Sequence, residues 1–491
     1  MSDQQPSTTG TAGPTAAGST GTAGAASTDS GVPGATTASR VTPSAEDTAA
    51  AYATAASAGT LAAAASTAPI KGGLGDYART YVRRARGGEA GSLPAVLALV
   101  VLVAIFSIAH HPFFTLGNLA NLVTQSAPIM LLAMGLVFVL LLGEIDLSAG
   151  VASGVSAATA AVLIYKGQSP VVAVIAALAT GVATGFLIGI TRAKLRVPSF
   201  IVTLALFLAL QGVVLLIVTG ATNQGNIPLN SPALNAIENS QMPNWAGWLL
   251  LAVTVAGYAA YKLADTLGRR RLRLVAEPAV LTTIKVAAVL VVGGVLVYLL
   301  NVNRALNQGA GGFATVNGKI VKVQAAALTG VPWIVPILLA FFAVLAFVLK
   351  RTPYGRHVYA VGGNTEAARR AGIKVDAIRI SVFVICSTMA AVSGIVLASQ
   401  IGVNSAEGGG NTLLLAVGAV VVGGTSLFGG KGRVLDAVIG AVVVTVIQNG
   451  MSDIVSGNNG SAVQFIVTGL VLALAATVDA ISRRRAGAAG L

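Results

Sequence analysis

Two carboxylates stand between neighbouring apolar runs, in the segment Gly143-Glu-Ile-Asp-Leu-Ser-Ala-Gly150. No loop of ordinary length separates these runs, so Glu144 and Asp146 must lie close to whatever buries the runs. Charged side chains at membrane depth are costly and are usually paired or functional. The plainer interpretation is a tight turn in which Asp146 or Ser148 caps the following helix. The two interpretations are compatible if the cap lies inside a helical bundle.

A second segment, Gly423-Gly-Thr-Ser-Leu-Phe-Gly-Gly430, shares a G-x-x-[D/S]-L-x-x-G pattern with residues 143–150. Upstream, LLAMG at 131–135 is similar to LLAVG at 414–418. Corresponding glycine-interrupted apolar segments point to a transport pathway. The intervening lengths differ, so coincidence between low-complexity segments is the alternative. The apolar run 412–424 is short enough to be a broken or re-entrant helix.

The glycines at 429–433 do not form a nucleotide-binding loop. A G-x-x-x-x-G-K-[ST] pattern ending at Lys431 needs Gly at position 425 and Ser or Thr at 432, whereas the sequence has Thr425 and Gly432. No other stretch fits, so the sequence predicts no nucleotide site on this chain.

A basic segment after the apolar run 332–350 contains a short predicted helix, residues 365–371. Asn364 suits its N-cap, Glu366 its first turn, Arg369 and Arg370 its last turn, and Gly372 the position just after it. Such a helix would be about 10 Å long, too short to be stable alone in water. Either the rest of the chain or a docked partner must hold it; a solvated loop helix is the alternative.

The composition indicates a membrane protein. Of 491 residues, 55% are apolar and 10% are charged, whereas a soluble domain has about 25% charged residues. This excludes an ordinary soluble enzyme. The net charge of +14 comes from short basic clusters between apolar runs, which is not the pattern of a nucleic-acid-binding protein. One cysteine and three histidines predict neither a disulfide nor a metal site.

The apolar runs predict an all-α polytopic membrane protein with about twelve transmembrane helices. Lys and Arg gather in alternate connecting segments, which places both termini in the cytoplasm. Residues 1–70 are rich in Ala, Ser, Thr and Gly and predict a disordered cytoplasmic tail, so the transmembrane domain comprises 71–491. The predicted spans are 93–109, 120–142, 147–165, 169–190, 198–219, 246–263, 280–300, 332–350, 377–400, 412–424, 434–450 and 462–481.

Several polar residues in or near the spans are candidates for a translocation path, although each could instead join helices to one another. The candidates are Glu144, Asp146, Ser148, Thr203, Asn404, Thr425, Ser426 and Asn449.

Four motifs occur in a fixed order: the 143–150 segment, Pro198-Ser-Phe-Ile-Val-Thr-Leu204, the basic segment 352–373, and the 423–433 segment. Together they resemble the permease subunit of bacterial ATP-binding-cassette importers for monosaccharides, of the ribose/xylose type, over about residues 90–481. The extra span near 280–300, with its preceding basic stretch, resembles the xylose-type branch. Glu144 departs from the family pattern, in which many members have glycine, and the tail has no counterpart in it.

This resemblance implies a homodimer in the bacterial plasma (inner) membrane that binds no cofactor itself. ATP and Mg would bind to a partner ATPase, and a sugar-binding protein would act on the outer side. The resemblance implies that the short helix is the coupling helix. Its outward face carries small residues and would meet the ATPase. Its residues would be Gly363, Asn364, Glu366, Ala367, Ala368, Arg369 and Gly372.

Three classes of function compete. The first is import of a pentose such as xylose, although the sequence does not fix the sugar. The second is an ion-coupled secondary sugar transporter, which should carry carboxylates in mid-span; only Glu144, Asp146 and Asp436 are near, all at cytoplasmic ends. The third is a membrane-embedded enzyme, and the sequence contains no cluster of His, Cys or Asp that supports it.

Overall fold

The computed structural model describes residues 92–109, 111–222, 225–272, 277–303, 311–316, 319–324, 328–405, 409–454 and 462–470, with 473 and 477. All of them belong to one unit, residues 59–491. The predicted tail, residues 1–70, lies outside the described residues, and the predicted span 462–481 is described only in part.

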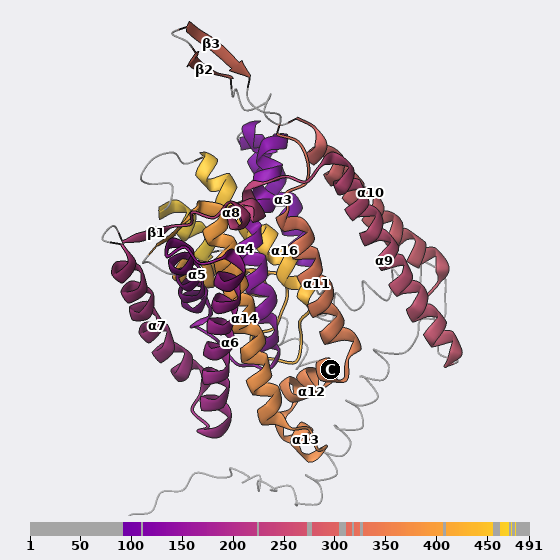
Figure 1. Ribbon diagram of the computed structural model, residues 1–491. Helices are drawn as coiled ribbons and strands as arrows, with labels where there is room; N and C mark the ends of the chain where they lie inside the picture. The colour runs from indigo at the N-terminus through magenta and orange to yellow at the C-terminus, as the bar shows by residue number, and fades with distance from the viewer. Residues whose placement is uncertain are drawn as a thin grey trace, which may run out of the picture. The chain divides into compact units, whose positions relative to one another are not determined.

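Helices make up almost all of the described chain (Figure 1). Eight are long and apolar enough to cross a membrane, and α3, α5 and α15 are shorter apolar helices. The all-α membrane fold is confirmed, whereas the total of twelve spans and the orientation stay predictions. The apolar helices are α3 (Leu93–Ala109), α4 (Leu116–Leu141), α5 (Ala149–Tyr165), α6 (Pro170–Lys194), α7 (Ser199–Ala221), α9 (Asn244–Arg271), α10 (Ala279–Asn301), α11 (Ile334–Arg351), α14 (Val375–Ile401), α15 (Gly410–Val422) and α16 (Val434–Ile454).

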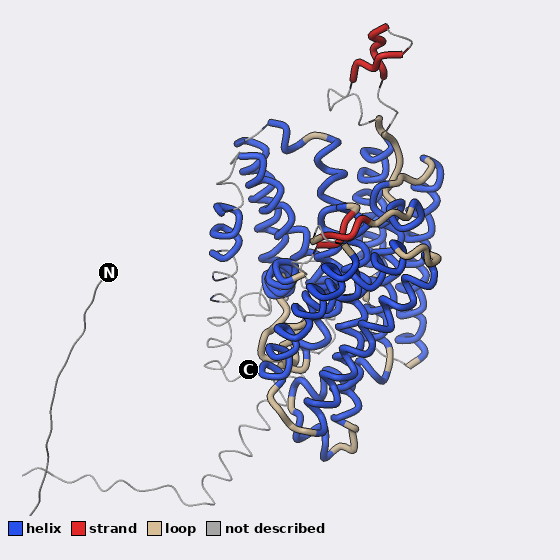
Figure 2. The backbone as a smooth tube through the Cα atoms, turned by 60° about the vertical axis from the view of Figure 1, so that its left-hand side comes forward, coloured by secondary structure: helices blue, strands red, loops and turns tan. Residues whose placement is uncertain are grey.

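Short elements join these helices. They are η1 (His111–Phe114), α8 (Pro232–Asn239), α12 (Pro353–Gly363), α13 (Thr365–Arg370) and four short strands. The strands, drawn red in Figure 2, form two antiparallel pairs. In one, β1 (Asn226–Pro228) pairs with β4 (Val403–Ser405), and in the other β2 (Gly311–Val316) pairs with β3 (Lys319–Gln324). We call the two ends of the bundle the α8 end and the α13 end.

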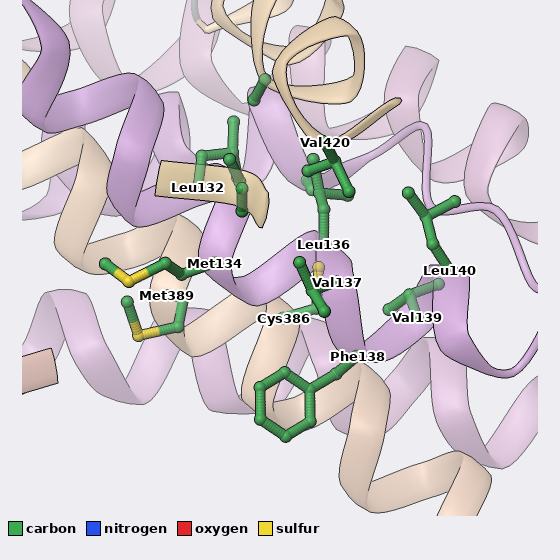
Figure 3. Close-up of a cluster of buried hydrophobic side chains, with 14 of the residues drawn as sticks. Leu132, Met134, Leu136, Val137, Phe138, Val139, Leu140, Cys386, Met389 and Val420 are labelled. Carbon is green, nitrogen blue, oxygen red and sulfur yellow. The ribbon is translucent and has the colours of Figure 1, made fainter. Parts of the chain in front are cut away.

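Helices α4 and α14 form the centre of the bundle. Every residue of α4 from Leu131 to Leu141 is buried, around its whole circumference, which is what an apolar helix without a polar face predicts. Met389 and Cys386 of α14 and Val420 of α15 pack against it (Figure 3). The other long helices surround this pair, and α9 and α10 have mostly exposed apolar side chains, as lipid contact requires.

A stripe of glycines on α6 allows α14 to approach its backbone closely. Gly181, Gly185 and Gly189 follow one another at four-residue spacing, and all three face α14. A Cβ atom added at Gly185 would lie 2.5 Å from the carbonyl oxygen of Phe383. In a membrane, helices associate through such close van der Waals contact between small residues, so the stripe determines how α6 docks on α14.

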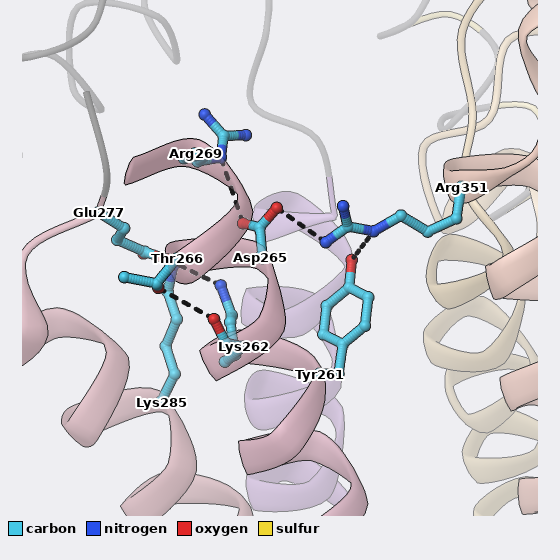
Figure 4. A network of polar contacts seen from close by, with 8 residues as sticks. All are labelled: Tyr261, Lys262, Asp265, Thr266, Arg269, Glu277, Lys285 and Arg351. Carbon is cyan, nitrogen blue, oxygen red and sulfur yellow. Dashed lines mark hydrogen bonds and ion pairs between the residues drawn. The ribbon is translucent and has the colours of Figure 1, made fainter. Parts of the chain in front are cut away.

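Ion pairs connect the hairpin of α9 and α10 and fasten it to α11 (Figure 4). Glu277, between the two helices, pairs with Lys262 of α9 at 2.8 Å and with Lys285 of α10. Asp265 of α9 pairs with Arg351 of α11 at 2.8 Å, and the Arg351 guanidinium also stacks on the Tyr261 ring. Ion pairs therefore fix the polar end of this lipid-exposed hairpin to α11, since apolar side chains cannot form such contacts.

A buried acid, Glu238, lies on α8. Its side chain is 3% exposed, and neither carboxylate oxygen has a hydrogen-bond partner among the described residues. Burial disfavours the charged form and raises the pKa of this carboxyl to about 8. Glu238 is therefore neutral in the folded protein at neutral pH.

The Glu238→Gln variant should change how stability depends on pH. The folded wild type keeps a proton on Glu238 up to about pH 8, whereas the unfolded chain releases it near 4.5. The stability due to this proton is complete below pH 4.5 and is lost as the pH rises toward 8. Thermal unfolding of the purified protein should show the variant more stable than wild type above that range, by a few kcal/mol at most, and equal to it below pH 4.5. A constant difference at all pH values would contradict the assignment.

Candidate functional site

The turn at 143–148, between α4 and α5, lies against the start of α7. The Ile145 amide donates a hydrogen bond to Ser199 Oγ at 3.3 Å, and Thr203 Oγ1 donates to the carbonyls of Ser199 (2.9 Å) and Ile145 (3.3 Å). Thr203 is fully buried. The first two sequence motifs, 143–150 and 198–204, therefore form one contact at the α13 end.

Glu144 is paired with two arginines. Its carboxylate accepts hydrogen bonds from Arg192 Nε of α6 at 2.9 Å and contacts Arg379 Nε of α14 at 3.2 Å. Glu144 is 7% exposed. Sequence analysis did not find these partners, because both arginines are far away in the chain. The pairing joins α6, α14 and the turn.

Asp146 lies in the same turn but has a different role. Its Oδ1 accepts hydrogen bonds from the Ser148 amide at 3.0 Å and the Ser148 hydroxyl at 2.7 Å. Within the described part of the chain its Oδ2 has no hydrogen-bond partner, and the Cys386 thiol faces the carboxyl. Of the two predicted cap residues, Ser148 is the N-cap of α5 without a side-chain cap bond, whereas Asp146 accepts from the Ser148 amide at the start of the helix.

The turn at 423–430 shares one side-chain hydrogen bond with the turn at 143–148. Ser426 Oγ accepts from the Phe428 amide at 3.1 Å, as Asp146 does from Ser148. The preceding helices also end alike, with glycines of positive φ, Gly143 (70°) and Gly424 (107°). The positive-φ glycine falls one position later in the second segment, because Gly423, which corresponds to Gly143 in the shared pattern, has φ of −63°. At 13 residues, α15 is about 20 Å long and shorter than the hydrocarbon core of about 30 Å.

Three turns and helix ends meet at the α13 end with their backbones in contact. The Gly430 amide donates to the Leu141 carbonyl at 2.8 Å. A Cβ atom at Gly362, near the end of α12, would lie only 1.8 Å from that same carbonyl oxygen. Tyr359 Oη of α12 donates to the Gly432 carbonyl at 2.7 Å. The 352–373 and 423–433 motifs thus join the first two.

Helix α12 was not predicted, since only residues 365–371 were expected to be helical in this segment. Its start follows a recognisable signal: Thr352 Oγ1 accepts from the Gly355 amide at 3.2 Å, and Pro353 occupies the first turn. The apolar side chains of Val358 and Val361 are buried. The segment is therefore anchored to the bundle rather than a free loop.

Helix α13 has the predicted caps. Asn364 Oδ1 accepts from the Ala367 amide at 2.9 Å. Gly372, with φ of 81°, ends the helix, and the Gly372 and Ile373 amides donate back to the carbonyls of Arg369 and Ala368, as in a Schellman motif. The expectation that Ala368 faces outward is wrong: Ala368 is 5% exposed and belongs to the core, whereas Gly363, Glu366, Ala367 and Arg369 are exposed.

The candidate path residues divide into two groups. Glu144, Asp146, Ser148, Thr203, Thr425 and Ser426 are all buried at the α13 end. Asn404 lies in β4, opposite Ile227 of β1, and Asn449 lies in the last part of α16, both at the α8 end. Asn449 accepts from Asn118 Nδ2 at 2.7 Å and donates to Gln125 Oε1 at 3.3 Å, and it borders a cavity of about 280 Å³.

Gly362→Ala should destabilise the protein much more than Gly363→Ala. The first change places a Cβ against the Leu141 carbonyl, whereas nothing lies within 4 Å of a Cβ at Gly363. Forced overpacking costs about 1–3 kcal/mol, and the second change replaces a helical glycine by a better helix former. Thermal unfolding of the two purified variants checks this. Equal stability of both variants would show that the backbone contact is not needed.

Asp146→Asn should be milder than Asp146→Ala. Asparagine keeps an oxygen that can accept from both Ser148 groups, whereas alanine removes two buried hydrogen bonds and should lower the free energy of unfolding by about 1–3 kcal/mol. The check is the folded yield in membranes together with the melting temperature. If asparagine were as damaging as alanine, the charge and not the hydrogen-bonding oxygen would be what the turn requires.

The chain has clear relatives. A family profile described as "Branched-chain amino acid transport system / permease component" matches residues 118–264 and 233–476. The xylose transport system permease protein of Escherichia coli is 34% identical over 413 residues, which cover 81% of this chain and 96% of that protein. The corresponding Haemophilus influenzae protein is 33% identical over 395 residues, 79% of this chain and 96% of its own.

The ribose import permease protein of Escherichia coli is 30% identical over 385 residues, covering 78% of this chain and 92% of that protein. No solved structure matches the chain. The matched residues include all four motifs that meet at the α13 end. The chain therefore belongs to this family of bacterial transport-system permeases, as a multi-pass protein of the inner membrane similar in sequence to the xylose-type permeases.

Proposed function

We propose that this protein is the permease subunit of an ATP-driven importer that moves a monosaccharide, xylose or a related pentose, into the cell. The observation that carries the proposal is the similarity to xylose permeases along 96% of their length. The structure supports it, since the four motifs of the resemblance lie together at one end of the bundle.

ATP hydrolysis would belong to a separate ATPase, which binds ATP and Mg, so that this chain is not itself an enzyme. Helix α13 suits the contact with that ATPase. Its six residues are held by caps at both ends, and Ala368 fixes it to the core. Glu366, Ala367 and Arg369 are exposed, which leaves one face for a partner. The coupling helix is thus supported, with Ala367 rather than Ala368 at the interface.

The distribution of Lys and Arg supports a cytoplasmic location for the α13 end. The α8 end would then receive sugar from an extracytoplasmic binding protein, and a second copy of the permease would complete the membrane part. We propose that residues 71–491 form the permease domain and that residues 1–70 are dispensable for transport. The ion-coupled alternative is less favoured, because two of its three candidate carboxylates, Glu144 and Asp436, are ion-paired.

The function is tested by uptake and by association with the ATPase. Cells that lack this chain should regain xylose uptake when it is supplied. Ala367→Trp should abolish most of that uptake and reduce the ATPase that copurifies about tenfold, since a clash of about 1–2 kcal/mol at a close interface lowers affinity by this order. Gly372→Val should act in the same direction, because a β-branched residue at its positive φ is strained by about 1–3 kcal/mol.

Ala233→Trp is the matched control, because Ala233 is exposed on α8 at the opposite end. It should keep the wild-type amount of copurified ATPase. Normal coupling in both the Ala367 and Gly372 variants, at normal membrane levels, would place the ATPase contact elsewhere, with the turn at 431–433 as the next candidate. Xylose uptake that persists without the chain would contradict the proposed function itself.

A further inference from the structure

Carboxamides are the most numerous side chains that line a cavity at the α8 end. It lies between the first half of α4, the last part of α14, the start of α15 and the last part of α16, and it is completed by a residue of the 462–470 helix. Its amides come from Gln125, Gln400, Gln448, Asn449 and Gln464. Two hydroxyl side chains, Thr412 and Ser452, join them.

We propose that this cavity is a binding site for the transported solute and that it selects an uncharged polyol. This inference rests on the proposed function and specifies where the sugar binds in the permease. A carboxamide both donates and accepts hydrogen bonds, as a sugar hydroxyl does, so the two match in either orientation. Among the residues that the structure describes, no Asp, Glu, Lys, Arg or His lines the cavity. An ionic solute would find no opposite charge there and would lose its hydration without compensation.

The cavity also has an apolar side, which suits the C–H face of a sugar ring. Pro128 and Ile129 of α4 and Leu415 of α15 contribute to it. Pro128 lies inside α4 and has no amide hydrogen, so the Thr124 carbonyl loses its usual helical donor. Pro128 itself lines the cavity. Its own carbonyl is occupied, since it accepts from Ser393 Oγ at 2.7 Å.

The amides differ in how firmly they are held. Asn449 is 6% exposed and is fixed between Asn118 and Gln125. Gln400 and Gln448 are half-buried and have no protein hydrogen-bond partner among the described residues. The volume of about 280 Å³ corresponds to about nine water molecules, which suits a single sugar ring. Two unpaired amides beside a fixed one are thus available to the ligand.

Cysteine protection tests the site directly. The native Cys386 is fully buried, so a thiol introduced into the cavity is labelled against a low background. In the purified permease–ATPase complex, a high concentration of xylose should slow maleimide labelling of Gln448→Cys at least about threefold. The control is Gln168→Cys, which lies exposed at the same end but outside the cavity, and its labelling should not change.

A second substitution measures the contribution of one amide. Gln400→Leu, added to Gln448→Cys, should raise the xylose concentration that gives half protection about three- to tenfold, as expected for one lost hydrogen bond. If xylose did not change the labelling of Gln448→Cys, the proposed binding site would be wrong. If wild-type cells still took up xylose in that case, the proposed function would stand without this binding site. Protection by leucine and not by xylose would overturn the assignment of a polyol.

Discussion

The hydrogen bond from the Gly430 amide to the Leu141 carbonyl joins the end of α4 to the turn between α15 and α16. Backbone groups buried in a helical bundle must find partners, because non-helical backbone is tolerated there only when it is satisfied. Gly362 makes room for this contact, since a Cβ atom at its position would occupy the place of the bond. Gly362 and Gly429 are thus explained by one geometric requirement, the approach of three backbones at the α13 end.

The backbone contact at the α13 end positions the elements on both sides of it. Toward the bundle, it places the turn at 143–148 where Glu144 reaches the arginines of α6 and α14. Toward the surface, it fixes the end of α12, and α13 follows directly with Ala368 in the core. A force applied to α13 would therefore reach the turns between α4 and α5 and between α15 and α16 through packed side chains and backbone. The amide cavity lies at the other end of these same helices, α4, α15 and α16.

Elements that follow from local chemistry were predictable from the sequence. Eleven apolar runs became helices, and the caps of α13 follow from Asn364 and Gly372, because both signals act within one turn of helix. Contacts between distant residues were not predictable. Nothing near Glu144 in the chain indicates Arg379 as its partner. Ala368 was misplaced because six residues do not show which face is buried, and the cavity joins amides from four separated segments.

The central claim is that α13 meets the ATPase through its exposed face, and cross-linking from a single site tests it most directly. A photoactivatable cross-linker on Ala367→Cys, in membranes that contain the whole transporter, should join the permease to the ATPase. The same reagent on Ala233→Cys should not, because that residue lies at the α8 end. A cross-link to the ATPase from Ala233→Cys, with none from Ala367→Cys, would contradict both the docking site and the orientation of the bundle.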